Sequence, residues 1–547
     1  MRGPSLISIV ALALALWAGE HALRGLWEPD EARYAYVAEE MARDGTWFVM
    51  HLHGEPYPDK PPLMFWLMRI VPGMTGSDEI GPVAARFPSL LGAVASLWVV
   101  GRLLARWIDG RAAWRGVLVL ATSHLFWKQG GWGQIDMLLC GLEMLGLYCF
   151  FGYDAASVDS RRTRFAWLLG AYTFAGLAVL AKGPVGLIVP LGIYVTSALA
   201  AGEGRRLRAW HWCWGILLAV AIPGAWLAIA WWQGAPHEYF EAMLGVKSFG
   251  RAIDDASGHG RPPYYYLLHF PMEFLPWTLF LPSAWFAMGA GTLRRRLTAW
   301  ALFVFALFSL FHGKRQLYIL GMYPAAAMIV AVGWPRLGSM VRLRGVTRAA
   351  TWFALLLPGI VAVAALAAVL HHDLPGHPAI ALPTAAAGSV GCWLSSRAFR
   401  REGWNDILLR IYAGTWLVLL ATVGAILLPA GNAIKAPLFA EERAARLTAP
   451  DEPIHLLREQ LAIVPLYAKR PGRLLRDETE LSRALDAGTV RIVVAHMRDW
   501  EKLPETLRAH AQAVSFKMGS KSLVWAEFSG STSTSALPGA IEVSPAK

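Results

Sequence analysis

The chain has 547 residues, of which 55% are hydrophobic, with a mean hydropathy of +0.39 and a net charge of +12 at pH 7. Long apolar runs recur to about residue 428, which excludes a single soluble domain and is typical of a polytopic α-helical membrane protein. The basic residues lie between the apolar runs and do not alternate with aromatic residues on one face, which argues against nucleic-acid binding.

The apolar runs predict about thirteen transmembrane helices. The expected spans are residues 4–26, 84–105, 115–130, 134–152, 165–181, 184–201, 212–232, 273–291, 298–312, 318–334, 349–370, 379–397 and 407–428. A cleaved secretory signal is the alternative for the first run, and the many spans that follow favour a retained helix. All four cysteines fall within expected spans, so the sequence predicts neither a disulfide framework nor a CxxC metal site.

Arginines orient these spans. They gather in alternate connections, such as those at residues 102–115, 205–208 and 294–296. The positive-inside rule places these connections and the N-terminus in the cytoplasm. An odd number of spans then places the loops at 27–83 and 233–272, and everything after residue 429, on the outer side.

The first outer loop, residues 27–83, carries an unusual set of charges. Asp30, Glu31 and Arg33 follow the first span closely, and Asp59 and Lys60 lie later in the same loop. Charges beside a membrane usually have a functional reason, so a short loop that holds carboxylates and cations predicts a reaction site. The alternative for Asp30 and Glu31 is a place in the first turn of a surface helix, where acids complement the helix dipole. The local sequence leaves both interpretations open.

The chain changes character after residue 432. Short β-like runs alternate with helical stretches, which predicts a small α/β domain outside the membrane over residues 431–528. The expected strands are Pro453–Leu457, Ile463–Tyr467, Val490–Ala495 and Leu523–Phe528, and the expected helices lie near 478–486 and 500–511. The last stretch, 529–547, is rich in Ser, Thr, Ala and Pro and is expected to be disordered. Residues 1–430 form the predicted transmembrane domain.

Six segments, in matching order, resemble the family 39 glycosyltransferases. This family includes protein O-mannosyltransferases and the aminoarabinose transferase that modifies lipid A. The segments are Asp30–Ala35; Asp59–Pro62 with Trp66; Gln134–Met137; Ala181–Pro184; His259 with Pro262–Tyr266 and Pro276–Trp277; and Gly313–Lys314 before Tyr318–Leu320. The resemblance covers residues 20–330. It implies a GT-C fold in a bacterial inner membrane, with a polyprenyl-phosphate sugar as donor and a hydroxyl or phosphate of a lipid, glycan or protein as acceptor.

The resemblance implies roles for three acidic residues. Asp30 would be the general base, or the carboxylate that orients the acceptor hydroxyl. Glu31 would be its neighbouring second acid. Asp136 would join this acidic cluster; the alternative for Asp136 is an N-cap of its span.

Cations are expected at the donor phosphate, because negative charge develops there as the phosphate leaves. The expected phosphate-binding residues are Arg33, Lys60, Lys182, Arg251 and Lys314, and their outer-side location runs against the positive-inside bias. Two alternatives stay open: Arg33 could pair with Asp30 or Glu31, and Lys182 could be a snorkelling lysine. The residues expected to line the substrate are Tyr34, Tyr57, Asp59 and His259.

No cofactor is predicted, and the sequence leaves a divalent metal open. Relatives that modify lipid A carry a histidine shortly before the position of Arg251 that contributes to a structural metal site. Val246, Lys247 and Ser248 occupy that stretch here, and Asp59 alone is a poor zinc site. Lipid A therefore gains no support as the acceptor, and the sequence names neither the sugar nor the acceptor.

A transporter or flippase of lipid-linked saccharides is the alternative function. Such a protein is expected to have charges near the middle of several spans, or inverted repeats. The polar residues of this chain gather instead at the outer ends of its expected spans. The sequence therefore favours the glycosyltransferase.

Overall fold

The computed structural model describes residues 3–77, 79–157, 160–208, 211–244, 260–339, 344–371 and 377–528. Two compact units are formed. The helical unit comprises Met1–Leu23, Pro58–Leu67 and Arg86–Ala430, and the α/β unit comprises Arg24–Tyr57, Met68–Ala85 and Gly431–Lys547.

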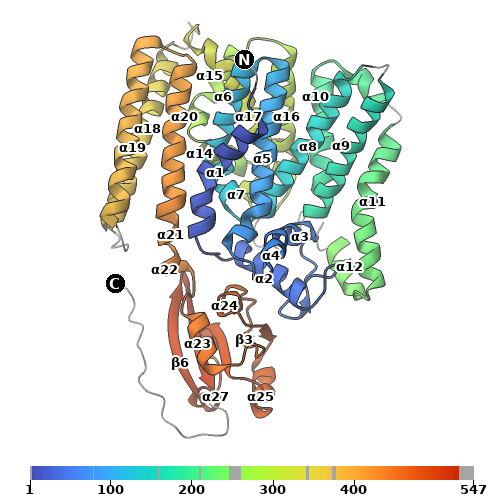
Figure 1. The fold of residues 1–547 in the computed structure, drawn as a ribbon, viewed down its shortest axis with the longest axis vertical. Coiled ribbons are helices and arrows are strands. Elements are labelled where there is room, and N and C mark those ends of the chain that lie inside the picture. The colour runs from blue at the N-terminus through green and yellow to red at the C-terminus, as the bar shows by residue number, and fades with distance from the viewer. Residues whose placement is uncertain are drawn as a thin grey trace. The chain divides into compact units, whose positions relative to one another are not determined.

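The helical unit is built from apolar helices, several of them long and others short (Figure 1). They are α1 (Leu6–Leu23), α5 (Pro82–Trp107, apart from its first turn), α6 (Gly110–Ala121), α7 (His124–Gly131), α8 (Ile135–Ala155), α9 (Arg161–Lys182), α10 (Val185–Ala200), α11 (His211–Trp232), α12 (His237–Leu244), α14 (Tyr265–Glu273), α15 (Leu281–Ala287), α16 (Thr292–Leu310), α17 (Tyr323–Gly333), α18 (Arg344–His371), α19 (His377–Glu402) and α20 (Asp406–Thr422). Among the described residues, seven helices are long and apolar enough to cross a membrane, and shorter apolar helices accompany them. The prediction of a polytopic helical membrane protein is confirmed.

Two of the expected spans are interrupted. The run 115–130 is divided between α6 and α7, and the run 273–291 falls on the end of α14, the 3-10 helix η3 (Trp277–Leu279) and α15. The two interrupted segments contact each other: the indole of Trp277 donates a hydrogen bond of 2.9 Å to the hydroxyl of Thr122. Non-helical backbone at membrane depth is tolerated where it is buried in protein, and this contact provides such burial.

Glycines bring α5 and α8 close together. A Cβ atom on Gly141 would lie only 2.4 Å from the Cα atom of Gly92 on the facing helix. At the start of α8, the Ser89 hydroxyl donates a 3.1 Å hydrogen bond to the carbonyl of Gln134. Small residues at helix contacts allow this close packing in membrane proteins, and it fixes the position of the first turns of α8.

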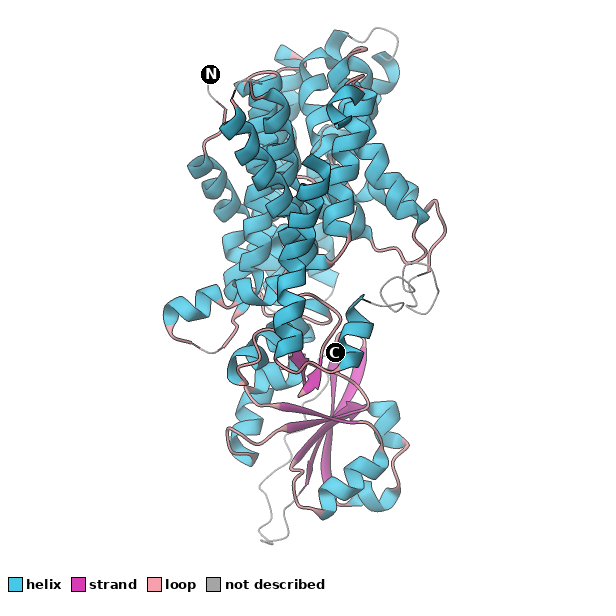
Figure 2. Cartoon of the chain, turned by 90° about the vertical axis from the view of Figure 1, so that its right-hand side faces the viewer, coloured by secondary structure: helices cyan, strands magenta, loops and turns pink. Residues whose placement is uncertain are grey.

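The α/β unit contains a mixed five-stranded sheet (Figure 2). Its strands are β3 (Ile454–Leu457), β4 (Gly472–Leu475), β5 (Ile492–His496), β6 (Ala511–Met518) and β7 (Lys521–Phe528), in the order β4-β3-β5-β7-β6. Strand β3 is parallel to β4 and β5, and β7 is antiparallel to β5 and β6. The shorter helices of this part are α23 (Ala440–Leu447), α24 (Ile463–Ala468), α25 (Glu478–Asp486), α26 (Met497–Glu501) and α27 (Glu505–Ala509).

One expected strand of this sheet was wrong. The run Ile463–Tyr467 belongs to helix α24, which provides the crossover between the parallel strands β3 and β4. A five-residue apolar run has too little periodicity to distinguish a buried strand from a buried helical turn. The expected strands near β3, β5 and β7 are confirmed, whereas β4 and β6 were not expected.

Much of the first loop packs with the C-terminal part of the chain. The loop contributes α2 (Asp30–Arg43), the short hairpin of β1 (His51–Leu52) and β2 (Glu55–Pro56), and α4 (Ile70–Thr75) to the α/β unit, while α3 (Leu63–Met68) lies largely in the helical unit. The hydroxyl of Tyr36 accepts a 2.6 Å hydrogen bond from the backbone of Gly472, and Tyr467 donates one of 3.2 Å to the carbonyl of Leu26. The sequence alone does not show that this loop and the C-terminal part belong to one unit.

Candidate functional site

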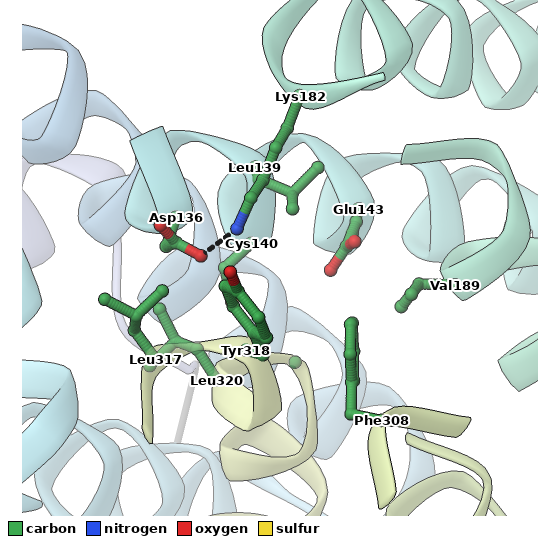
Figure 3. Close-up of a pocket in the computed structure, with 11 residues that line it drawn as sticks. Asp136, Leu139, Cys140, Glu143, Lys182, Val189, Phe308, Leu317, Tyr318 and Leu320 are labelled. Carbon is green, nitrogen blue, oxygen red and sulfur yellow. Dashed lines mark hydrogen bonds and ion pairs between the residues drawn. The ribbon is translucent and has the colours of Figure 1, made fainter. Parts of the chain in front are cut away.

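The helical unit encloses a small cavity near the first turns of α8. It is lined by Asp136, Leu139, Cys140 and Glu143 of α8, Lys182 of α9, Val189 of α10, Phe308 of α16, and Leu317, Tyr318, Leu320 and Gly321 of the 3-10 helix η4 (Gln316–Met322). The cavity has room for about one water molecule. Its walls are mostly apolar, and its charged groups are two carboxylates and one ammonium (Figure 3).

Lys182 and Asp136 form an ion pair at this cavity. Lys182 is the last residue of α9, because Gly183 adopts a φ of +82° and ends the helix. The ammonium also lies 4.5 Å from the centre of the Tyr318 ring, where it makes a cation–π contact. Asp136 is not the N-cap of α8, since Gln134 occupies that position. Lys182 is therefore directed into the protein and does not snorkel toward a membrane surface.

Glu143 is the cavity residue that the sequence analysis missed. It lies two helical turns beyond Asp136 on the same face of α8, with only 4% of its surface exposed. Figure 3 shows its carboxylate pointing into the cavity beside the rings of Tyr318 and Phe308. One signal could have found it: a lone carboxylate in the middle of an apolar span is a functional-site hypothesis in its own right.

The acidic residues of the first loop lie at the start of α2. Asp30 is the first residue of this helix and is 9% exposed. Pro29 occupies the N-cap position, so Asp30 does not cap the helix, although its charge complements the dipole. Glu31 accepts two hydrogen bonds, of 2.7 and 2.9 Å, from the guanidinium of Arg24, and both side chains are fully buried. Arg24 therefore compensates the charge of Glu31.

Arg33 shares this end of α2 with Asp30 and Tyr57. Burial disfavours the charge of Arg33, but Tyr57, Glu28 and Asp30 raise the pKa of its guanidinium above the usual value. A hydrogen bond between the side chains of Arg33 and Tyr57 contributes to this shift, and Tyr34 and Tyr57 are both buried. The ion-pair partner of Glu31 is thus Arg24. Of the two pairings expected for Arg33, the one with Asp30 is supported by their electrostatic interaction.

Glu28 is a second carboxylate that the sequence analysis did not select. Its carboxylate accepts a 3.1 Å hydrogen bond from the backbone of Ile463 in α24. Burial raises the pKa of Glu28 to about 7, although Lys521 and Arg33 act in the opposite direction. This carboxyl group therefore changes its charge near neutral pH.

The other predicted site residues are distributed as follows. Asp59 is exposed and Lys60 is half-buried, both just before α3. Lys314 is buried and donates hydrogen bonds to the carbonyls of Arg261, at 2.9 Å, and Phe311. Its ammonium is therefore used by backbone groups of its own region. Arg251 and His259 lie outside the described residues.

The predicted site residues thus form two separate groups in the structure. The first group is Asp136 with Lys182, and the second is Asp30 with Arg33 and Tyr57. The first group belongs to the helical unit and the second to the α/β unit. Among the described residues, no group of three His, Cys, Asp or Glu side chains could hold a metal ion.

Comparison with known proteins gives a consistent result. Residues 5–237 match the family model of the dolichyl-phosphate-mannose-protein mannosyltransferases. The undecaprenyl phosphate-alpha-4-amino-4-deoxy-L-arabinose arabinosyl transferase of Shewanella sediminis is 31% identical over 316 residues, which are 57% of this chain and 56% of that protein. The enzyme of the same name from Edwardsiella ictaluri is 31% identical over 375 residues, which are 65% of this chain and 63% of that protein. The chain thus matches less than two thirds of the length of these relatives.

The fold matches a solved structure over almost the whole chain. The crystal structure of ArnT from Cupriavidus metallidurans bound to undecaprenyl phosphate matches with a TM-score of 0.74 and 22% sequence identity. The match covers 95% of this chain and 97% of the ArnT chain. The apo structure of the same protein gives a TM-score of 0.73. The predicted GT-C architecture, with a small C-terminal α/β part, is confirmed.

Proposed function

We propose that the chain is a membrane glycosyltransferase of family 39 that uses a polyprenyl-phosphate sugar as donor. The family model over residues 5–237, the two transferases that are 31% identical and the matching fold support this proposal. The observation that carries the proposal is the half-buried Lys182 ammonium, which Asp136 and the Tyr318 ring hold at a cavity inside the helical unit. A fixed cation in such a place can compensate the charge of a departing lipid phosphate.

The proposed reaction is a displacement at the anomeric carbon of the sugar. The oxygen of an acceptor hydroxyl forms the new bond, and the bond between the anomeric carbon and the phosphate oxygen breaks. The electron pair of that bond leaves with the polyprenyl phosphate, and the hydroxyl proton passes to a carboxylate. Asp30 is the proposed proton acceptor, because its carboxylate lies in the first turn of α2 beside Arg33.

The other roles also remain proposals. Lys182, Lys60, Arg33 and Arg251 would stabilise the phosphate. Lys314 is a weaker candidate, since its ammonium already donates to the carbonyls of Arg261 and Phe311. Glu31 is a weaker candidate for a second base, since Arg24 already binds its carboxylate on both oxygens. Tyr34, Tyr57, Asp59 and His259 would line the substrates.

The donor sugar is proposed to be an amino sugar. The names of the two bacterial relatives specify undecaprenyl phosphate-linked 4-amino-4-deoxy-L-arabinose. The acceptor is proposed to be a hydroxyl or phosphate group of an envelope lipid, glycan or protein. We further propose a location in the bacterial inner membrane, with the N-terminus in the cytoplasm and the C-terminal part in the periplasm, because the arginine-rich connections alternate along the chain.

Purified protein in proteoliposomes, whose bilayer separates two compartments, tests this function. It would be incubated with undecaprenyl-phosphate 4-amino-4-deoxy-arabinose and an extract of envelope acceptors. Mass spectrometry would follow the donor lipid and the acceptors. We expect acceptor-dependent release of undecaprenyl phosphate and an acceptor mass increased by one sugar. Donor that crosses the bilayer but stays intact would favour the flippase alternative and contradict the proposal.

A further inference from the structure

The charges in the cavity of the helical unit do not balance. Asp136 and Glu143 bring two carboxylates, whereas Lys182 brings one ammonium, and that ammonium pairs with Asp136. Among the described residues, no hydrogen bond or ion pair reaches the carboxylate of Glu143. The single cation of the cavity therefore pairs with only one of its two acids, and the carboxylate of Glu143 has no ion-pair partner there.

The surroundings of Glu143 make this imbalance costly. Val189, Phe308 and Leu139 line the same cavity, and Glu143 is only 4% exposed. A buried carboxylate without a partner is unfavourable in apolar surroundings, so it either keeps its proton or meets a cation supplied from outside. A ligand that carries an ammonium group would supply that cation.

We propose that Glu143 forms the subsite that binds an ammonium group on the transferred sugar. This inference rests on the proposed function, and it makes Glu143 a residue that determines donor specificity. The ammonium of the sugar and the carboxylate of Glu143 would form a buried, charge-assisted hydrogen bond. A donor with a hydroxyl group in place of the amine would leave this carboxylate without its cation.

The spacing along α8 suits a single sugar ring. Asp136 and Glu143 are separated by seven positions, which is about 10 Å along a helix axis. Helical side chains lean toward the N-terminus, so the carboxylate of Glu143 leans back toward Asp136. Lys182 would face the phosphate end of the donor, and Glu143 would face the far side of the ring. Since the cavity holds about one water molecule, a bound sugar displaces part of its lining.

Two donors that differ in one group test the inference. They are undecaprenyl-phosphate 4-amino-4-deoxy-arabinose and undecaprenyl-phosphate arabinose, which has a hydroxyl at that carbon. Transfer would be measured with purified wild type and Glu143→Gln, and the specificity is the ratio of kcat/KM for the two donors. Glu143→Gln keeps nearly the same shape but removes the negative charge.

We expect wild type to prefer the amino donor. Glu143→Gln should lose about 10–100-fold in kcat/KM for the amino donor and change little for the hydroxyl donor. Glu143→Asp, which keeps the charge, should retain part of the preference. Asp154→Asn is the matched control, because Asp154 lies at the other end of α8, bonded to Tyr194 and outside the cavity, and it should leave the ratio unchanged.

Other results would overturn the inference. An equal loss for both donors in Glu143→Gln would show that Glu143 only positions Lys182 or supports the helix. A wild type that transfers both sugars equally well would remove ammonium recognition but leave the glycosyltransferase function intact. Transfer from neither donor would overturn the proposed function, and the inference with it.

Discussion

Two buried acids of this protein, Glu31 and Asp136, are each compensated by a cation, and each pair restricts what its members can do. Arg24 binds both carboxylate oxygens of Glu31, and Lys182 binds Asp136. Removing one member of a buried pair leaves the other charge uncompensated, which typically costs about 3–5 kcal/mol. The activity of a variant at these positions is therefore compared only in protein that is shown to fold.

The role of Lys182 can be tested at the level of donor binding. Lys182→Ala should raise the KM for the donor about 10–100-fold, because a charge-assisted hydrogen bond is worth about 1.5–3 kcal/mol. Lys182→Arg should restore part of the affinity, since it keeps the positive charge. Lys517→Ala, at an exposed site on β6, is the control. Unchanged donor kinetics in Lys182→Ala would remove phosphate binding from this residue.

Glu28 should make stability depend on pH. Its folded pKa of about 7 lies above the ordinary value of 4.5, so the folded state holds this proton more tightly than the unfolded state does. The resulting stabilisation is present at low pH and is lost as the pH rises from 4.5 to about 7. Glu28→Gln stays neutral, so its advantage in stability over wild type should grow by about 2 kcal/mol between pH 5 and pH 8.

Melting temperatures of wild type and Glu28→Gln at the two pH values measure this effect. The comparison with wild type is needed because His53 and His455 act in the opposite direction: burial lowers the pKa of His53 to about 3 and that of His455 to about 4. A difference between the two proteins that stays constant from pH 5 to pH 8 would exclude the raised pKa.

The site residues differ in how well the sequence predicts them. Asp136 and Lys182 lie far apart in the chain but each stands out as a charge at the end of an apolar run, and the structure joins them. Glu143 also stands alone in an apolar run, but it lies in the middle of its span, whereas the predicted site residues lie at span ends and in loops. The pairing of Glu31 with Arg24 depends on the turn between α1 and α2, which the sequence does not define.

At the scale of elements, the apolar runs predicted most helices because a membrane span needs a long, continuous apolar segment. The interruption between α6 and α7 was not predictable in the same way. Thr122 and Ser123 lie at that interruption and bond to carbonyls of the preceding turn, at Leu118 and Leu120, and neither residue is a strong helix breaker. The helix at Ile463–Ala468 was missed because a short apolar run fits either a strand or a helical turn.

The contact between α5 and α8 gives a prediction at this scale. Gly141→Ala should destabilise the protein by about 1–3 kcal/mol, because the new methyl group would overlap the backbone of Gly92. Gly224→Ala in α11 is the matched control, since a Cβ there meets nothing within 4 Å. Thermal unfolding in detergent compares the two variants. Equal melting temperatures would show that α5 and α8 are not packed this closely.

At the scale of the whole molecule, the arginine distribution predicts the orientation in the membrane. Alkaline phosphatase fused after residue 440, just inside the C-terminal part, should be active in a bacterial host, and a cytoplasmic reporter fused there should be inactive. The same pair of reporters fused in the arginine-rich connection at 205–208 should give the opposite pattern. Active cytoplasmic reporters after residue 440 would reverse the orientation and move the proposed reaction to the other side of the membrane.

The central claim is that this chain transfers a sugar from a polyprenyl phosphate and that Asp30 receives the acceptor proton. The most direct measurement is acceptor-dependent release of undecaprenyl phosphate by purified wild type, Asp30→Asn and Asp44→Asn. Asp44 is the control because it is an acid at the opposite end of α2. Wild type and Asp44→Asn should be active, and folded Asp30→Asn should lose about 10²–10⁴-fold in rate. Full activity of Asp30→Asn, or no release by the wild type, would contradict the account.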